Sequence, residues 1–190
     1  MTAEPRAVPA PLVNLANALT TMRLLLVPVF GALVVASGMT DPAWRMAAWG
    51  AFTVASVTDL VDGWVARSLN QVTAFGKVAD PIADKALIGT ALLLLSWYEL
   101  VPWWVTALIL GREFGITALR LVVLRRGVIP ASRGGKLKTL LQSVSIGWFL
   151  LPLPDHLAAP APWVMYAALV VTLLTGADYV VRAVRLKRVP

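Results

Sequence analysis

The chain has 190 residues, of which 58% are hydrophobic and only 14% are charged, and its formal net charge is +7. A soluble domain carries about 25% charged residues, so the composition excludes an ordinary soluble protein. The absence of cysteine excludes disulfides, thiolate metal sites and cysteine nucleophiles. On a membrane protein, positive charge reflects topology and contact with anionic lipids. No basic soluble surface with interleaved aromatic residues is present, so we expect no nucleic-acid partner.

The predicted elements are all helical. Residues 1–11 are rich in proline, and we expect them to be disordered. Residues 12–22 alternate apolar with polar residues, which favours a short N-terminal helix lying on the membrane surface. Long apolar runs separated by short breaks then predict six transmembrane helices. The predicted fold is therefore an all-α integral membrane domain over 12–190, with spans at 18–38, 44–67, 77–98, 101–125, 136–153 and 161–184.

The distribution of Lys and Arg predicts the orientation. With a cytoplasmic N-terminus, the outer side holds only Arg45, which satisfies the positive-inside rule. We expect a multi-pass protein of the inner (cytoplasmic) membrane, with both termini and the active site facing the cytoplasm. The basic residues placed on the inner side are Arg6, Arg23, Arg67, Lys77, Arg125, Arg126, Arg133, Lys136, Lys138, Arg182, Arg185, Lys187 and Arg188.

Four carboxylates interrupt the second and third predicted spans. Asp59 and Asp62 are three residues apart, and Asp80 and Asp84 are four apart, so each pair shares a helix face. Charged groups are costly inside a membrane unless they have partners. Asp59 and Asp84 each lie about 12 Å along their helices from the connecting loop. A hairpin of the two helices therefore brings all four carboxylates to a similar depth.

This carboxylate cluster predicts bound metal. Oxygen-only ligand sets suit hard divalent cations such as Mg²⁺ or Mn²⁺, and two such ions can bind a diphosphate and polarise its phosphorus for attack. Gly63, Ala66 and Gly76 lie in the same region, where small residues let a nucleotide or its phosphates approach the backbone. Lys85 either neutralises the cluster or contacts substrate, and the sequence favours neither role.

The full spacing of this region is D-x2-D-G-x2-A-R-x8-G-x3-D-x3-D. It resembles the signature of the CDP-alcohol phosphatidyltransferase family at every fixed position. The resemblance extends to Asn17-Ala18-Leu19-Thr20 with Arg23 and Pro28. The segments 111–113, 118–120 and 135–139 are similar to the branch of the family that uses glycerol 3-phosphate, the phosphatidylglycerophosphate synthases.

The resemblance implies a transfer of phosphatidyl from CDP-diacylglycerol to sn-glycerol 3-phosphate with release of CMP, in membrane lipids and as a homodimer. Asp84 would be the catalytic base that accepts the proton of the attacking hydroxyl. The implied metal ligands are Asp59, Asp62, Asp80 and Asp84. The implied CDP-binding residues are Asp62, Gly63, Ala66, Arg67 and Gly76.

Glycerol 3-phosphate also needs cations to hold its dianionic phosphate. Arg112 and Arg120 are about 12 Å apart along one helix, too far for both to hold one phosphate from a straight helix. Lys136 and Lys138 begin the fifth predicted span, near the end where Arg120 should lie. We expect Arg120 and Lys138 to bind the phosphate, with Lys136 nearby and Arg112 paired with Glu113 or with a site carboxylate. The alternative is that all four cations bind lipid headgroups or internal partners.

Other interpretations remain. The same carboxylates could form the ion path of a cation-coupled transporter, and within the family the acceptor could be inositol phosphate or phosphatidylglycerol. Arg67 could serve only as an anchor at the membrane edge. The separation Asp178 to Arg182 indicates a structural ion pair on one helix face.

Overall fold

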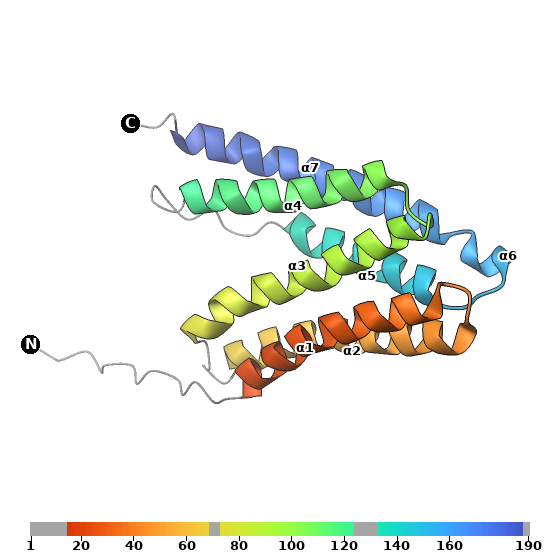
Figure 1. Ribbon diagram of the computed structural model, residues 1–190. Helices are drawn as coiled ribbons and strands as arrows, with labels where there is room; N and C mark the ends of the chain where they lie inside the picture. Colours follow the sequence, from red (N-terminus) through yellow and green to blue (C-terminus); the bar gives the residue numbers. More distant parts are fainter. Residues whose placement is uncertain (1–14, 69–72, 124–132, 188–190) are drawn as a thin grey trace, which may run out of the picture.

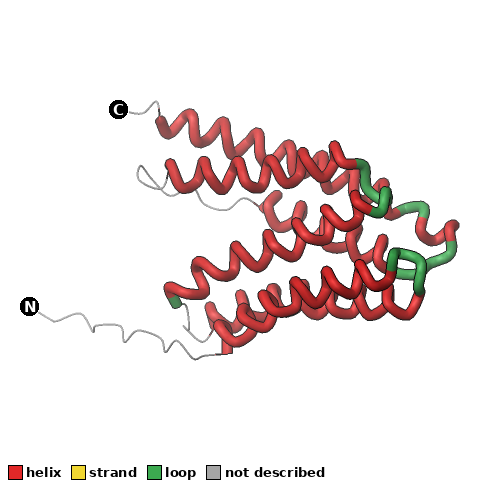
Figure 2. The backbone as a smooth tube through the Cα atoms, in the orientation of Figure 1, coloured by secondary structure: helices red, strands yellow, loops and turns green. Residues whose placement is uncertain are grey.

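The computed structural model describes residues 15–68, 73–123 and 133–187, which are helical apart from short loops (Figures 1 and 2). Six long helices and one short helix occur in this part of the chain. Each of the six predicted spans coincides with one long helix. The helices are α1 (Leu15–Ser37), α2 (Pro42–Ser68), α3 (Ala74–Trp97), α4 (Trp103–Val123), α5 (Arg133–Leu150), α6 (Asp155–Ala158) and α7 (Ala161–Lys187).

The prediction of a separate N-terminal surface helix is wrong for the residues described. Leu15–Ser37 is one uninterrupted helix, so the second half of the predicted surface helix is the first part of α1. The physical reason is that its polar residues find partners inside the protein: Asn17, Thr20 and Arg23 are all buried. The predicted disordered segment 1–11 lies outside the described residues. The four-residue helix α6 lies in a segment predicted only as a loop.

Local sequence signals explain where the first two helices end and begin. Gly38 adopts a φ of 51°, a left-handed conformation that suits glycine after a helix C-terminus. The Asp41 carboxylate then accepts hydrogen bonds from the backbone N–H groups of Ala43 (2.8 Å) and Trp44 (3.2 Å). This side chain caps the N-terminus of α2, and Pro42 occupies the first helical position, where its missing N–H costs nothing.

The helices form two packed groups that meet along the middle of the molecule. Helix α1 packs on α2 and α3, while α7 packs on α4 and α5. The groups join where α2 meets α5 and where α3 meets α4 and α5. The start of α1 and the end of α7 lie at one end of the bundle, and the loops after α1 and α3 and the helix α6 lie at the other (Figure 1).

Among the residues whose side chains are described, the main apolar cluster lies in the half of the bundle near those loops. In α1 and α3 the core residues come from the second half of each helix, and in α2, α4 and α7 they come from the first half. The rings of Phe30 and Phe52 lie 5.6 Å apart in this core. The other half holds the buried polar and charged residues of α1 and the carboxylates of α2 and α3. The largest fully buried side chains in the core half include Phe30, Phe52, Leu92, Leu95, Ile109, Ile146, Leu150 and Met165.

Two described stretches, Asn17–Ser37 and Asp155–Val184, are long and apolar enough by themselves to cross a membrane. Helices α2, α3 and α4 have comparable lengths of 27, 24 and 21 residues, but they carry the charged residues predicted to form the site. Exposed tryptophans gather at the loop end of these helices: Trp44 at the start of α2, Trp97 at the end of α3, and Trp103 at the start of α4.

Arg45 fastens α2 to the end of α5. Its guanidinium donates hydrogen bonds to the carbonyl oxygens of Phe149 (2.9 Å), Leu150 (3.3 Å) and Leu151 (2.8 Å). Carbonyls in the last turn of a helix lack partners within the helix, and a cation there also interacts favourably with the helix dipole. The one basic residue predicted for the outer side therefore stabilises the fold at that end of the bundle.

Candidate active site

A polar face of α1 contacts the carboxylates of α2 and α3. Arg23 has no exposed surface and forms an ion pair with Asp59, whose side chain is 36% exposed. The hydroxyl of Thr20 donates a hydrogen bond of 2.7 Å to Asp80. Helix α1 thus orients one carboxylate on each of the two helices that carry the predicted motif.

The start of α1 is joined to the segment before α3 in the same way. The hydroxyl of Thr73 donates a hydrogen bond of 2.7 Å to the side-chain oxygen of Asn17, and both residues are buried. Asn17, Thr20 and Arg23 are spaced by three residues, so they lie along one face of the helix. These three residues form a supporting row for the carboxylates.

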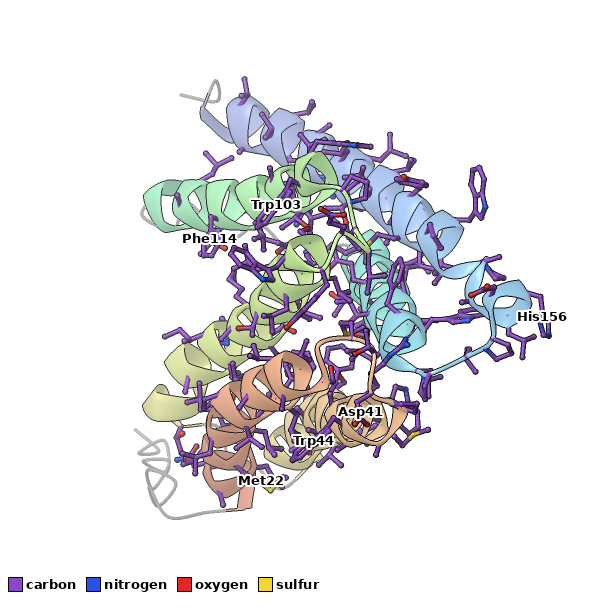
Figure 3. The ribbon with its side chains drawn as sticks, turned by 45° about the vertical axis from the view of Figure 1, so that its right-hand side comes forward. Met22, Asp41, Trp44, Trp103, Phe114 and His156 are labelled. Carbon is purple, nitrogen blue, oxygen red and sulfur yellow. The ribbon has the colours of Figure 1, made fainter. Side chains whose placement is uncertain are left out.

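Asp84 faces a small pocket where α3, α4 and α5 meet. The pocket is also lined by Lys85, Glu113, Phe114 and Lys138, and Figure 3 shows Phe114 on the side of α4 toward α3. Asp84 lies within electrostatic range of Asp59 and of the charged groups of this pocket. Asp59 and Asp84 are therefore near enough to influence each other electrostatically.

Glu113 binds two cations from different helices. The Lys138 ammonium on α5 contacts its carboxylate, and a guanidinium nitrogen of Arg112 lies 3.0 Å from the same oxygen. The three side chains are only 12–18% exposed, so the pairs are shielded from water. Arg112 is therefore paired with Glu113, which is one of the two arrangements expected from the sequence.

Arg112 also reaches α7. A second guanidinium nitrogen donates a hydrogen bond of 3.0 Å to the hydroxyl of Thr175. Beside it, Gly176 leaves space for the arginine chain: a Cβ at position 176 would lie 2.9 Å from Nε and 3.0 Å from Cγ of Arg112. A row of contacts thus runs from α7 through α4 to α5 and ends at Lys138 in the pocket.

Several predicted site residues have side chains outside the described part of the structure. Asp62, Gly63, Ala66 and Arg67 belong to α2, Gly76 belongs to α3, and Arg120 belongs to α4, but nothing further is described for them. Lys136 is exposed on α5, whereas Lys138 is largely buried.

The described carboxylates supply the oxygen ligands that a divalent cation prefers, but by themselves they do not form a complete metal site. Asp59, Asp80 and Asp84 all keep some accessible surface, and they offer only oxygen ligands. Among the residues whose side chains are described, no three acidic or histidine side chains gather closely enough to hold an ion. Asp62, three residues after Asp59, is the remaining predicted ligand.

An apolar groove separates α2 from α5 on the outer surface of the bundle. Its walls include Ser56 and Val57, which lie within one turn of Asp59 on α2. The groove thus starts beside the carboxylates and runs toward the core half of the molecule. The other residues that line it are Trp49, Phe52, Thr53, Ser143, Val144, Gly147, Trp148, Leu151, Leu153 and Leu157.

Sequence reasoning missed the contribution of α1 and α7 to the site. Arg23 was assigned to topology, yet it is buried against Asp59. The signal was present in the three-residue spacing of Asn17, Thr20 and Arg23. No comparable signal marks Thr175, since a threonine in an apolar helix is common. His156 lies on α6 and projects away from the bundle (Figure 3).

Residues 13–174 match the CDP-alcohol phosphatidyltransferase family. The chain is 54% identical to a probable phosphatidylglycerophosphate synthase of Mycobacterium tuberculosis, over 93% of this chain and 84% of that protein. It is 38% identical to the CDP-diacylglycerol–glycerol-3-phosphate 3-phosphatidyltransferase of Bacillus subtilis, over 87% of this chain and 93% of that protein. The Escherichia coli protein with the latter name is 36% identical, over 82% and 83% of the two chains.

Proposed function

This chain belongs to the CDP-alcohol phosphatidyltransferase family, whose members are integral membrane enzymes, and we propose that it transfers the phosphatidyl group of CDP-diacylglycerol to sn-glycerol 3-phosphate. The reaction releases CMP and forms phosphatidylglycerophosphate, a step of phospholipid biosynthesis. The observation that carries this choice of substrates is the identity of 36–54% to relatives named for this reaction, each across more than four fifths of both chains.

The chemical step follows from the carboxylates. Asp84 accepts the proton of the attacking hydroxyl of glycerol 3-phosphate while that oxygen forms a bond to the lipid-side phosphorus. The bond from that phosphorus to the bridging oxygen breaks, and CMP leaves with the electron pair. Asp84 suits this role because it faces the pocket at the junction of three helices, and a carboxylate within hydrogen-bond reach of the hydroxyl is a competent base.

Asp59, Asp62, Asp80 and Asp84 would hold two divalent cations, Mg²⁺ or Mn²⁺, on oxygen ligands. When bound, such ions neutralise the diphosphate and polarise the phosphorus that is attacked. Arg23 and Thr20 support this arrangement, because each binds one of the carboxylates and thereby limits its rotation. Asp62, Gly63, Ala66, Arg67 and Gly76 form the proposed CDP site.

The acceptor's phosphate binds on the opposite side of the pocket. Lys138 supports this assignment, because its ammonium lines the same pocket as Asp84. Arg120, on the same helix as Glu113, is the proposed second cation, with Lys136 at the helix start. This arrangement places the hydroxyl of glycerol 3-phosphate toward Asp84 and its phosphate toward α4 and α5.

The groove between α2 and α5 suits an acyl chain of CDP-diacylglycerol. It is mainly apolar and starts within one turn of Asp59, where the diphosphate would bind. A lipid placed there would have its tail along the membrane-facing side of the bundle and its headgroup at the carboxylates. The membrane orientation proposed from the basic residues places this site at the cytoplasmic end of the six spans, and we propose a homodimer on the family resemblance.

An acceptor panel tests the proposed function directly. The purified full-length protein is mixed with CDP-diacylglycerol in detergent micelles with Mg²⁺ or Mn²⁺, and CMP release is followed with glycerol 3-phosphate, inositol phosphate and phosphatidylglycerol. We expect CMP with glycerol 3-phosphate and none when the cations are chelated. Preference for another acceptor would reassign the branch, and ion transport in vesicles without any CMP would overturn the enzyme assignment.

A further inference from the structure

The row of contacts that runs from α7 through Arg112 and Glu113 to Lys138 gives the last helix a role at the pocket. We propose that Thr175 and Gly176 are positioning residues, which act through Arg112 and Glu113 to hold Lys138 for the phosphate of the acceptor. This inference rests on the proposed function.

Thr175 is oriented for this contact by its own helix. Its hydroxyl donates to the carbonyl oxygens of Val171 (2.8 Å) and Thr172 (3.0 Å) one turn earlier. Because the proton is used there, the oxygen presents lone pairs to an outside donor, and Arg112 supplies it with a hydrogen bond of 3.0 Å. A guanidinium can only donate, so the two groups are matched in one direction.

Gly176 provides the space that this contact needs. It is buried in α7, and any side chain would bring a Cβ to within 3.0 Å of two Arg112 atoms. The Nε of Arg112 is buried there without a hydrogen-bond partner. The middle of the arginine side chain therefore fits against α7 because residue 176 has no side chain, and a hydrogen bond from Nε plays no part in this fit.

The charges explain why Lys138 needs this support. A carboxylate paired with one ammonium has no net charge, so Glu113 alone would cancel the attraction of Lys138 for a phosphate. Arg112 contacts the same oxygen of Glu113, which leaves the trio with one net positive charge. Glu113 therefore fixes the position of Lys138, and Arg112 preserves its attraction for an anion.

The test measures KM for each substrate with the full-length protein. Thr175→Val keeps the shape of the side chain but removes the acceptor oxygen, and Gly176→Ala displaces Arg112. We expect each to raise the KM for glycerol 3-phosphate about tenfold, as for loss of one hydrogen bond to a charged group, and to leave the KM for CDP-diacylglycerol unchanged. Thr175→Ser retains the hydroxyl and should remain near wild type.

Two controls separate this role from general damage. Thr106→Val removes a buried hydroxyl that bonds to Ser96 at the other end of the bundle, and Gly50→Ala adds a methyl group where nothing lies within 4 Å. Neither should change the KM for glycerol 3-phosphate. In a Lys138→Ala background, Thr175→Val should add no further rise, because both act at one point.

An equal rise in KM for both substrates, or no rise for either, would overturn the inference. The inference would also be overturned if Thr175→Val raised the KM for glycerol 3-phosphate in the Lys138→Ala background by as much as it does in the wild-type protein. If Gly176→Ala does not fold, the comparison of Thr175→Val with Thr175→Ser tests the inference by itself. Wild-type protein that releases no CMP with glycerol 3-phosphate would instead refute the proposed function, so the two failures are distinguishable.

Discussion

At the scale of single residues, the site contains charged side chains that a membrane interior penalises unless they are paired. Two of the described pairs cross between helices: Arg23 of α1 binds Asp59 of α2, and Lys138 of α5 binds Glu113 of α4. Asp84, in contrast, has no hydrogen bond or ion pair among the described contacts, although several charges lie near it. That difference agrees with the proposed role of Asp84 as the base, whereas the paired residues connect the helices.

Asp84→Asn should therefore abolish turnover with little change in CDP-lipid binding. The amide cannot accept a proton, and a general base contributes about 10² to 10⁴-fold to the rate. The measurement combines CMP release with binding of a non-hydrolysable CDP-lipid. Asp62→Asn is the contrasting variant, in which metal and nucleotide affinity should fall together. Near-normal turnover of Asp84→Asn would remove it as the base.

Arg23→Met should lower both stability and activity, because it leaves the Asp59 carboxylate without the cation that orients it. Losing one partner of a fully buried pair costs about 3–5 kcal/mol; since Asp59 is 36% exposed, we expect about half of that. Thermal unfolding in detergent measures the effect. The control is Arg182→Met, which breaks the exposed pair with Asp178 on α7 and should cost at most about 1 kcal/mol. Equal effects of the two substitutions would contradict this assignment.

Arg120→Ala and Lys138→Ala should each raise the KM for glycerol 3-phosphate strongly, with far less effect on the KM for CDP-diacylglycerol. Each removes a cation proposed to bind the acceptor's phosphate before the chemical step. Initial rates at varied concentrations of each substrate provide the measurement. If the KM rises equally for both substrates, or if it rises for neither, the acceptor binds elsewhere in the protein.

At the scale of elements, side-chain hydrogen bonds fix how the helices begin, end and join. Asp41 caps α2, and Arg45 on the next turn binds three carbonyls at the end of α5. These two residues lie at the end of the bundle far from the carboxylates. Both charged residues stabilise the structure at this end of the bundle through hydrogen bonds to backbone groups.

Arg45→Ala should destabilise the protein without changing its kinetics at low temperature. It removes the arginine donor from three carbonyl oxygens at the end of α5, and hydrogen bonds to a charged group contribute about 1.5–3 kcal/mol each. Arg45→Lys should recover only part of this stability, because an ammonium lacks the planar fork. An unchanged Tm in Arg45→Ala would show that the contacts add nothing.

The sequence predicts the six long helices well, because apolar runs and the breaks between them depend on nothing outside each segment. It also predicts that each pair of carboxylates shares one helix face, because that follows from the spacing within a single helix. What it does not predict is which face of α1 or α7 meets the site. Arg23 and Thr175 acquire their partners only through packing, and the continuity of α1 depends on buried partners in the same way.

At the scale of the whole molecule, exposed tryptophans lie at the end of the bundle opposite to the one where the sequence predicts most of the basic residues. The start of α1 and the end of α7 share one end (Figure 1), and Trp44, Trp97, Trp103 and Trp163 are exposed toward the other. Aromatic residues prefer the membrane interface and basic residues prefer the cytoplasmic side. Both patterns agree with the proposed orientation.

Cysteine labelling tests that orientation without background, because the chain contains no cysteine. Thr40→Cys and Glu99→Cys place a thiol in the two loops at the tryptophan end, and Asn70→Cys places one between α2 and α3. In intact cells a membrane-impermeant maleimide should label the first two and not the third. All three should react after permeabilisation. Labelling of Asn70→Cys in intact cells would reverse the proposed topology.

The position of the described apolar cluster in one half of the bundle has a consequence for how this architecture can diversify. The residues that keep the helices together, such as Phe30 and Phe52, are not those that face the acceptor. Substitutions around Lys138 or Thr175 therefore leave the packed half intact, and they avoid the cavity cost of a core substitution as long as the buried charges of Arg112 and Glu113 keep their partners. An engineer who seeks a new acceptor alcohol can vary the polar ends of α4, α5 and α7 while holding the packed half constant.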